Sequence, residues 1–299
     1  MSWFVYSSDK SKFAPWKIMT SNNIFLDIFR KILAGTVDLP SLPDAALKIR
    51  AAIQNPNNDI AAIAKIVQMD PPLTAHLIQV ANSPLYRTAN NATDVAMAIS
   101  RFGLEATRNI AVSFSLKSLF KSNSKILQKL LKSLWLESTQ TAAISSVLAS
   151  QCKGFDPDRA MLAGLLQDIG TLPVLAELNK HPELLVDTDQ TEVMLLEYSP
   201  KVGAMLLKHW NFEDDIVEVA ASKNQWNRQP NKDADLADLV LIARYHAYIG
   251  KPFFKNCPKV AEIPAFEKLG FDSLTPESSL TILEDAKKDI MEIQGMLNV

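Results

Sequence analysis

Apolar residues recur along most of the chain at intervals of three and four, which is the spacing of one face of an α-helix. Residues 43–54 and 59–70 show this pattern clearly, and each begins with a helix-start signal, Pro43-Asp44 in the first and Asp59 in the second. The residues expected to face the interior are Ala46, Ile49 and Ile53 in the first segment and Ile60, Ile63, Ala64 and Val67 in the second. The alternation of apolar and polar residues that is typical of strands is almost absent, so the pattern predicts helices.

The same periodicity predicts helices in the rest of the chain. The further segments are 71–83, 94–103, 104–120, 125–150, a segment that begins near Asp158 and runs through 163–172, then 234–250 and 275–299. Gly103 and Gly250 are suitable helix ends, because glycine adopts the left-handed conformation that often follows a helix. The last segment carries an apolar stripe that could pack on its own body or on a second copy, formed by Leu280, Leu283, Ile290, Ile293 and Leu297. No repeat of fixed period is present, and we expect an all-α protein.

Composition and charge limit the class of protein and its partners. Of 299 residues, 47% are apolar and 21% charged, as is ordinary for a soluble globular protein. The net charge of −2 gives no global basic field, so we expect no nucleic-acid partner. No stretch approaches the roughly 18 apolar residues of a membrane span, and the start of the chain lacks the features of a signal peptide. Two isolated cysteines fit a reducing compartment, so we expect a cytoplasmic protein with no membrane contact.

Residues 1–34 differ from the rest in being crowded with aromatic side chains among polar ones. These aromatic residues are Trp3, Phe4, Tyr6, Phe13 and Trp16. We interpret the segment as an extension that docks on the helical body. A partner-binding arm is the alternative.

Residues 163–172, AGLLQDIGTL, place a carboxylate in the middle of an apolar run. Burying Asp168 there is costly unless a partner compensates its charge. That partner could be a metal, a cationic side chain or hydrogen-bond donors of the chain.

Several motifs resemble those of one family. The segment AGLLQDIG resembles the AGLLHDIG segment of the HD superfamily of metal-dependent phosphohydrolases, with Gln167 in place of the histidine. Residues 39–49, 67–87 and 95–112 resemble the N-terminal half of HDOD domains, which are relatives of these enzymes in bacterial signalling proteins. The resemblance implies a multi-helix HD-like bundle with an additional N-terminal helical half. It suggests an extension at 1–34, an HDOD domain at 35–235, divided into 35–122 and 123–235, and C-terminal helices at 236–299.

The resemblance also locates the positions of the HD metal ligands in this chain. They are Glu137, Gln167, Asp168, Ser199, Lys223, Asn224 and Arg244, with the register of the last three uncertain by about a residue. Of these, Asp168 keeps its ligand chemistry, whereas Lys223 and Arg244 are cations that oppose a metal. We therefore expect no metal, no cofactor and no catalytic residue. We expect Lys223 or Arg244 to pair with Asp168 and Glu137, and the alternative is that Asp168 accepts ordinary hydrogen bonds.

Other candidate residues give weaker signals. The histidines at 76, 181, 209 and 246 lack H-x-H and H-E-x-x-H spacing. We expect His76 to be a core histidine, and only His246 could approach the old ligand positions. Cys152 has no evident base beside it, so an inert thiol is expected. The lysines at 117, 121, 125, 129 and 132 predict a solvated face, with a phosphate-binding strip as the alternative.

Three functions remain open at this point. The first is a bacterial signal-transduction scaffold that acts through a partner protein or a ligand. The second is a metal-dependent phosphohydrolase acting on a nucleotide or phosphodiester, for which the sequence offers few ligands. The third is an anion-binding module in which Lys223 and Arg244 hold an anionic nucleotide without hydrolysing it. A homodimer is compatible with the apolar stripe of the last segment.

Overall fold

The computed structural model describes residues 30, 40–55, 57–180, 188–251, 254, 257–270, 281 and 284–298, and among these it contains helices and no strands. The expectation of an all-α fold is confirmed. Apart from Arg30, the predicted extension at residues 1–34 lies outside the described residues.

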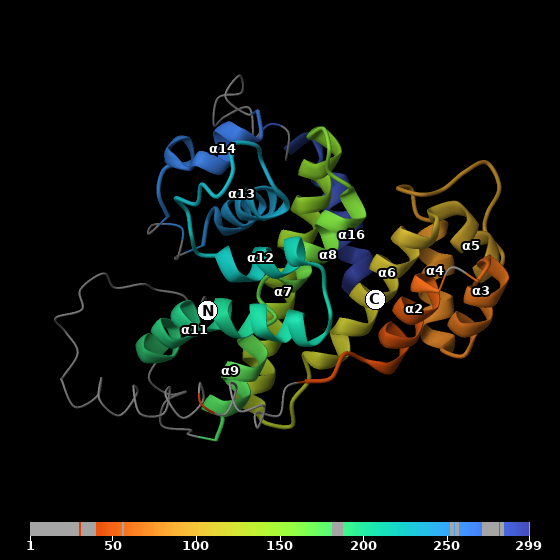
Figure 1. The fold of residues 1–299 in the computed structure, drawn as a ribbon, viewed down its shortest axis with the longest axis horizontal. Coiled ribbons are helices and arrows are strands. Elements are labelled where there is room, and N and C mark those ends of the chain that lie inside the picture. The colour runs from red at the N-terminus through yellow and green to blue at the C-terminus, as the bar shows by residue number, and fades with distance from the viewer. Residues whose placement is uncertain are drawn as a thin grey trace.

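The described residues of the N-terminal half form short helices (Figure 1). They are α2 (Asp44–Gln54), α3 (Ile60–Gln68), α4 (Pro71–Ala81), α5 (Val95–Phe102) and α6 (Leu104–Leu116). The carboxylate of Asp59 accepts a hydrogen bond from Ala62 N at 2.8 Å, so the predicted cap of α3 is confirmed. Gly103 ends α5 with φ of 77°, as expected. The prediction that Ile60 faces inward is wrong, because this first residue of α3 is 38% exposed at the helix edge.

The second half is arranged around the long helix α7 (Lys125–Gln151). The elements that follow α6 in this half are η2 (Lys117–Leu119), α7, α8 (Pro157–Leu166), α9 (Thr171–Leu178), α11 (Thr188–His209), α12 (Asp214–Ser222), α13 (Leu236–Tyr248), η4 (Val260–Glu262), α14 (Pro264–Lys268) and α16 (Lys287–Asn298). Helices α8, α13 and α16 all pack against α7. The division of the chain at residues 34 and 235 stays a prediction.

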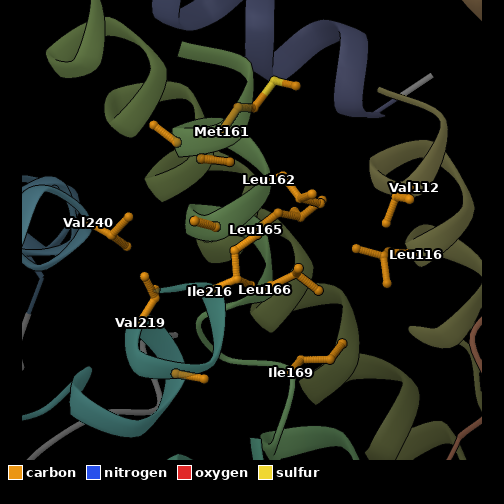
Figure 2. Close-up of a cluster of buried hydrophobic side chains, with 14 of the residues drawn as sticks. Val112, Leu116, Met161, Leu162, Leu165, Leu166, Ile169, Ile216, Val219 and Val240 are labelled. Atoms are coloured by element: carbon orange, nitrogen blue, oxygen red, sulfur yellow. The ribbon is translucent and has the colours of Figure 1, made fainter. Parts of the chain in front are cut away.

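Helix α8 and the turn after it lie at the centre of the core. Figure 2 shows Leu162, Leu165 and Ile169 between the side chains of α6 on one side and those of α12 and α13 on the other. By length and composition the apolar stretch Pro157–Leu178 could cross a membrane, but 94% of its most apolar window is buried inside the protein. Its hydrophobicity is explained by this central position, since both halves of the molecule pack on it.

The predicted continuous helix through 163–172 is wrong, because α8 ends at Leu166 and α9 begins at Thr171. Thr171 N donates to Asp168 O at 2.9 Å in the turn between them. Gly170 lies directly against Ser199 O and the backbone of Gly203 in α11, where a Cβ atom would overlap both. Gly164 lies similarly close to Ala142 and Ser145 of α7. Gly164 and Gly170 therefore allow this segment to pack closely against the backbones of α7 and α11. The turn between α8 and α9 brings Asp168 into the bundle.

The C-terminal helix α16 packs on the chain's own body. Ile293 and Leu297 are buried beside α7. Trp135 Nε1 donates to Asn298 Oδ1, and Lys117 Nζ donates to Asn298 O, both at 2.8 Å. Lys117 therefore does not belong to a solvated face, whereas the other four lysines of that strip are exposed. Two residues of the predicted stripe, Leu280 and Leu283, lie outside the described residues.

Candidate functional site

The turn between α8 and α9 places Asp168 where α12 and α13 meet the bundle. Asp168 is 7% exposed. Oδ1 accepts a hydrogen bond from Lys223 Nζ, and Oδ2 accepts one from Arg244 Nη1 at 2.7 Å. Lys223 follows the last residue of α12, and Arg244 lies in α13. The carboxylate is therefore bound on each oxygen by a cation from a different helix.

Arg244 holds the centre of this cluster together. Its Nη1 also donates to Gln167 Oε1 at 3.1 Å, and its Nη2 donates weakly to Asn224 Oδ1 at 3.5 Å. Its guanidinium carbon lies 4.9 Å from the ring centroid of Tyr248, within the range of a cation–π contact. Arg244 is 4% exposed, and its Nε has no hydrogen-bond partner among the described residues. One buried donor of this arginine is thus left over.

The pKa values follow from burial and from these three charges. Burial raises the pKa of the Asp168 carboxyl, but the charges of Arg244 and Lys223 outweigh it and hold this pKa at about 2. Burial lowers the pKa of Lys223 to about 8, against the opposing effect of Asp168. Burial also lowers the pKa of Arg244, but the attraction of Asp168 raises it more, so the guanidinium stays charged. Asp168 is a carboxylate at neutral pH, and its charge is compensated by the protein itself.

A cavity of about 40 Å³ lies beside the cluster. Its lining residues are Leu134, Glu137, Asp168, Thr171, Leu195, Leu196, Ser199, Lys223, Asn224, Arg244 and Tyr248. The structure thus brings together all the sequence-predicted positions. Gln167 does not line the cavity, but its Oε1 accepts a hydrogen bond from Arg244, which does. Burial raises the pKa of Glu137, and the charge of Lys251 opposes this effect.

The neutral members of the set are held by nearby backbone. Ser199 Oγ donates to Leu195 O in the preceding turn of α11. Asn224 Nδ2 donates to Leu196 O at 2.9 Å. Of the pair 223–224, Lys223 bonds Asp168 and Asn224 bridges to α11.

The chemistry of these residues does not fit a divalent metal. In the described part of the chain, no group of three or more His, Cys, Asp or Glu side chains is placed to hold a metal ion. The two carboxylates at the cavity face two buried cations, and a metal ion would have to displace both from Asp168. Divalent ions are bound by several carboxylate, carbonyl or imidazole ligands, and ammonium and guanidinium groups repel them.

The histidines that the structure describes lie elsewhere. His76 is 4% exposed and stacks on Phe114 with ring centroids 4.5 Å apart, so the expected core position is confirmed. His246 Nδ1 lies 2.8 Å from Ile242 O of its own helix, and His246 does not line the cavity. Thus His246, the one histidine that could approach the old ligand positions, does not reach the cavity. His209 is the exposed last residue of α11, and His181 lies outside the described residues.

A second buried ion cluster was not found from the sequence. Arg228 Nη1 donates to the carboxylates of Asp235 and Asp238, and Lys268 Nζ donates to Asp238 at 3.1 Å. Asp235 and Asp238 also form a capping box at the start of α13, which is a pattern of two acids three apart before an apolar run. That signal was present in the sequence, but it does not reveal Arg228 or Lys268 as partners.

A third set of charges joins the two halves at the turn between α11 and α12. Arg50 of α2 donates to Trp210 O at 2.7 Å and to Asn211 O at 2.6 Å. Arg159 of α8 binds both carboxylate oxygens of Asp215, at 2.9 and 2.6 Å. The start of α12 is therefore fixed to the N-terminal half and to α8, while its end carries Lys223.

Comparisons with known proteins agree with this fold. The model of the HDOD domain family matches residues 39–226. A relative from Treponema pallidum, described only as uncharacterized, is 24% identical over 225 residues, which are 69% of this chain and 41% of the relative. The chain thus spans less than half the length of that relative.

Solved structures similar to this chain cover nearly all of it. A protein from Shewanella amazonensis SB2B, provisionally named a metal-dependent phosphohydrolase, has a TM-score of 0.77 at 22% identity, covering 93% of this chain and 99% of its own. An HDOD domain protein of unknown function from Geobacter sulfurreducens has a TM-score of 0.65 at 21% identity, covering 91% and 97%. A protein from Marinobacter aquaeolei VT8, provisionally named for signal transduction, has a TM-score of 0.63 at 22% identity, covering 94% and 66%.

These identities are low enough that the solved structures establish the fold alone, and their names describe those proteins. The family model, in contrast, spans well over half of this sequence, including the N-terminal helical half and Asp168. The chain belongs to the HDOD domain family.

Proposed function

We propose that this chain is a bacterial, cytoplasmic signal-transduction module that acts by binding a partner protein, and that its former HD metal site is now a structural ion-pair cluster. The observation that carries the proposal is the pairing of Asp168, whose two oxygens are bound by Lys223 and Arg244. A hydrolase of the HD type needs a metal to activate water and to neutralise phosphate charge. Here the charge at that position comes from side chains that cannot activate water.

The position of α12 supports a scaffold role. Its last turn leads into Lys223 at the ion cluster, and its first turn is joined through Asp215 to Arg159. A displacement of one end of this nine-residue helix would therefore displace the contacts at its other end. Helices that join two packed units in this way can carry a binding signal between them, provided that both ends have two arrangements.

The alternative of a metal-dependent phosphohydrolase has the name of the Shewanella neighbour in its favour. Against it stands the donor set of this chain, in which two buried cations take the place of ligands. The alternative of a nucleotide-binding module is disfavoured by size, because a cavity of about 40 Å³ is far below the roughly 300–1,000 Å³ of typical small-molecule sites.

Metal content after loading tests the proposal. Purified protein is dialysed against metal-free buffer, loaded with manganese, iron or zinc, desalted, and measured by inductively coupled plasma mass spectrometry. We expect far less than one metal per chain in every case. The double variant Lys223→His, Arg244→Asp is the matched control, because it restores ligand chemistry at two positions and should bind more metal than the wild type. About one metal per wild-type chain, with hydrolysis of a phosphodiester, would show that the proposal is wrong.

A further inference from the structure

The ion cluster around Asp168 has more positive than negative charge. Lys223 and Arg244 are each 4% exposed, and Asp168 is the single carboxylate that bonds them directly in the described part of the chain. Two buried cations therefore share one direct counter-charge. A buried charge without a full partner is costly, and the cost is relieved when an anion approaches.

The cluster also has more donors than acceptors. An ammonium group has three N–H donors and a guanidinium group has five. Within the described residues, Lys223 Nζ bonds Asp168, and Arg244 bonds Asp168, Gln167 and Asn224 through its two terminal nitrogens. Arg244 Nε is buried without a partner. Both cations thus have more N–H groups than these bonds use, and both residues line the same cavity.

The cavity has the size of a small ion. Its volume of about 40 Å³ is room for a few waters, since one water needs a cavity of about 10–15 Å³. The hydroxyl of Ser199 is used toward Leu195 O, so its oxygen can accept but its proton is committed. Besides Ser199, the lining side chains that carry N–H or O–H donors are those of Lys223, Arg244, Asn224, Thr171 and Tyr248.

We propose that this cavity binds a small anion, up to the size of one phosphate group, which Lys223 and Arg244 hold while both stay paired with Asp168. The site would then have exchanged a cation for an anion: where HD enzymes hold a metal between carboxylates, this chain holds an anion between cations. The inference goes beyond the scaffold proposal and rests on its view of the ion cluster. Because Lys223 directly follows α12, occupancy of the cavity would act on the helix that joins the two halves.

Glu137 limits the affinity. Its carboxylate lines the same cavity and would repel an anion when it is ionised. Burial raises the pKa of Glu137, which favours its neutral form. Replacing Glu137 by glutamine removes this repulsion without touching the two ion pairs of Asp168, so the variant tests the site with little risk to folding.

The experiment is a calorimetric titration of inorganic phosphate into the full chain, treated with EDTA and kept in a buffer with gluconate in place of chloride. We expect saturable binding of one phosphate per chain. Binding should be about fivefold tighter in Glu137→Gln, which lacks the repelling carboxylate, and this corresponds to about 1 kcal/mol at about 1.4 kcal/mol for each tenfold change in affinity. Lys223→Met should lose the binding, and the matched surface variant Lys208→Met should keep it. Adenosine monophosphate should bind more weakly than phosphate, because the cavity has no room for the nucleoside.

Three outcomes would overturn the inference. One is the absence of saturable binding at roughly 10 mM phosphate, about ten times the dissociation constant of a millimolar site. Another is binding that is equal in the wild type and Glu137→Gln, which would place the anion elsewhere. The third is tighter binding of adenosine monophosphate, which would indicate a nucleotide site. Absence of phosphate binding in a protein that also takes up no metal leaves the scaffold proposal intact, so the two can fail separately.

Discussion

Replacing Asp168 by asparagine removes the charge that compensates two buried cations. The pKa of Asp168 is about 2 in the folded chain, against an ordinary value of 3.8. At about 1.4 kcal/mol for each pKa unit, the folded environment stabilises the carboxylate by about 2 kcal/mol. Removal of one partner from a buried ion pair typically costs about 3–5 kcal/mol. We therefore expect Asp168→Asn to lower the free energy of unfolding by about 2 to 5 kcal/mol.

The pH dependence of this loss has a defined sign. The folded pKa of Asp168 is below its unfolded value, so its stabilisation is present above pH 3.8 and is lost as the pH falls toward 2. The difference in stability between wild type and variant should shrink over that range. In the variant, Lys223 loses the partner that holds its pKa up to about 8. It should then give up its proton more easily, which relieves part of the cost as the pH rises toward 8.

Urea unfolding followed by circular dichroism measures the effect. The exposed residue Asp233 gives the control, since Asp233→Asn should change the free energy of unfolding by less than about 0.5 kcal/mol. A double-mutant cycle with Lys223→Met should show that the two changes together cost less than their sum, because the double variant no longer buries Lys223 without its partner, although Arg244 still lacks Asp168. A loss below 0.5 kcal/mol in Asp168→Asn, or strict additivity in the cycle, would refute the reasoning.

Two further predictions concern the core. The folded pKa of His76 is lowered to about 4 by burial and by the charge of Lys117. Because the unfolded chain binds the proton first, the contribution of His76 should lower the free energy of unfolding by about 3 kcal/mol from pH 6.5 to 4. The wild type should therefore lose more stability than His76→Leu over this range, and urea midpoints that fall equally in both proteins would contradict the assignment. Gly170→Ala should destabilise the protein by more than about 3 kcal/mol, because its Cβ would overlap Ser199 O and the backbone of Gly203. Gly295→Ala in α16, whose Cβ would meet nothing within 4 Å, should instead raise the free energy of unfolding by up to about 1 kcal/mol through helix propensity. Equal changes in the stability of the two variants would argue against the packing at Gly170.

Much of the helical fold could be predicted because its signals are local. Helix-start residues such as Asp59 and helix ends such as Gly103 act within four residues of the chain, and both are used as expected. The break after Leu166 was missed, because nothing in the apolar pattern of 163–172 distinguishes a turn from a helix. The reason for the turn is the contact of Gly170 with α11, which is about thirty residues away in the sequence.

The sequence by itself determined the helical class, the resemblance to the HDOD family, and the identity of the residues at the old ligand positions. Only the tertiary structure decided how those residues pair. Lys223 and Arg244 are 55 and 76 residues from Asp168 in the chain, and both reach the same carboxylate. Local propensity carries no information on such distant contacts, because they depend on how α8, α12 and α13 pack together. The pairing of Arg228 with Asp238 was equally unpredictable, because nothing near either residue in the sequence indicates that these two charges are buried together.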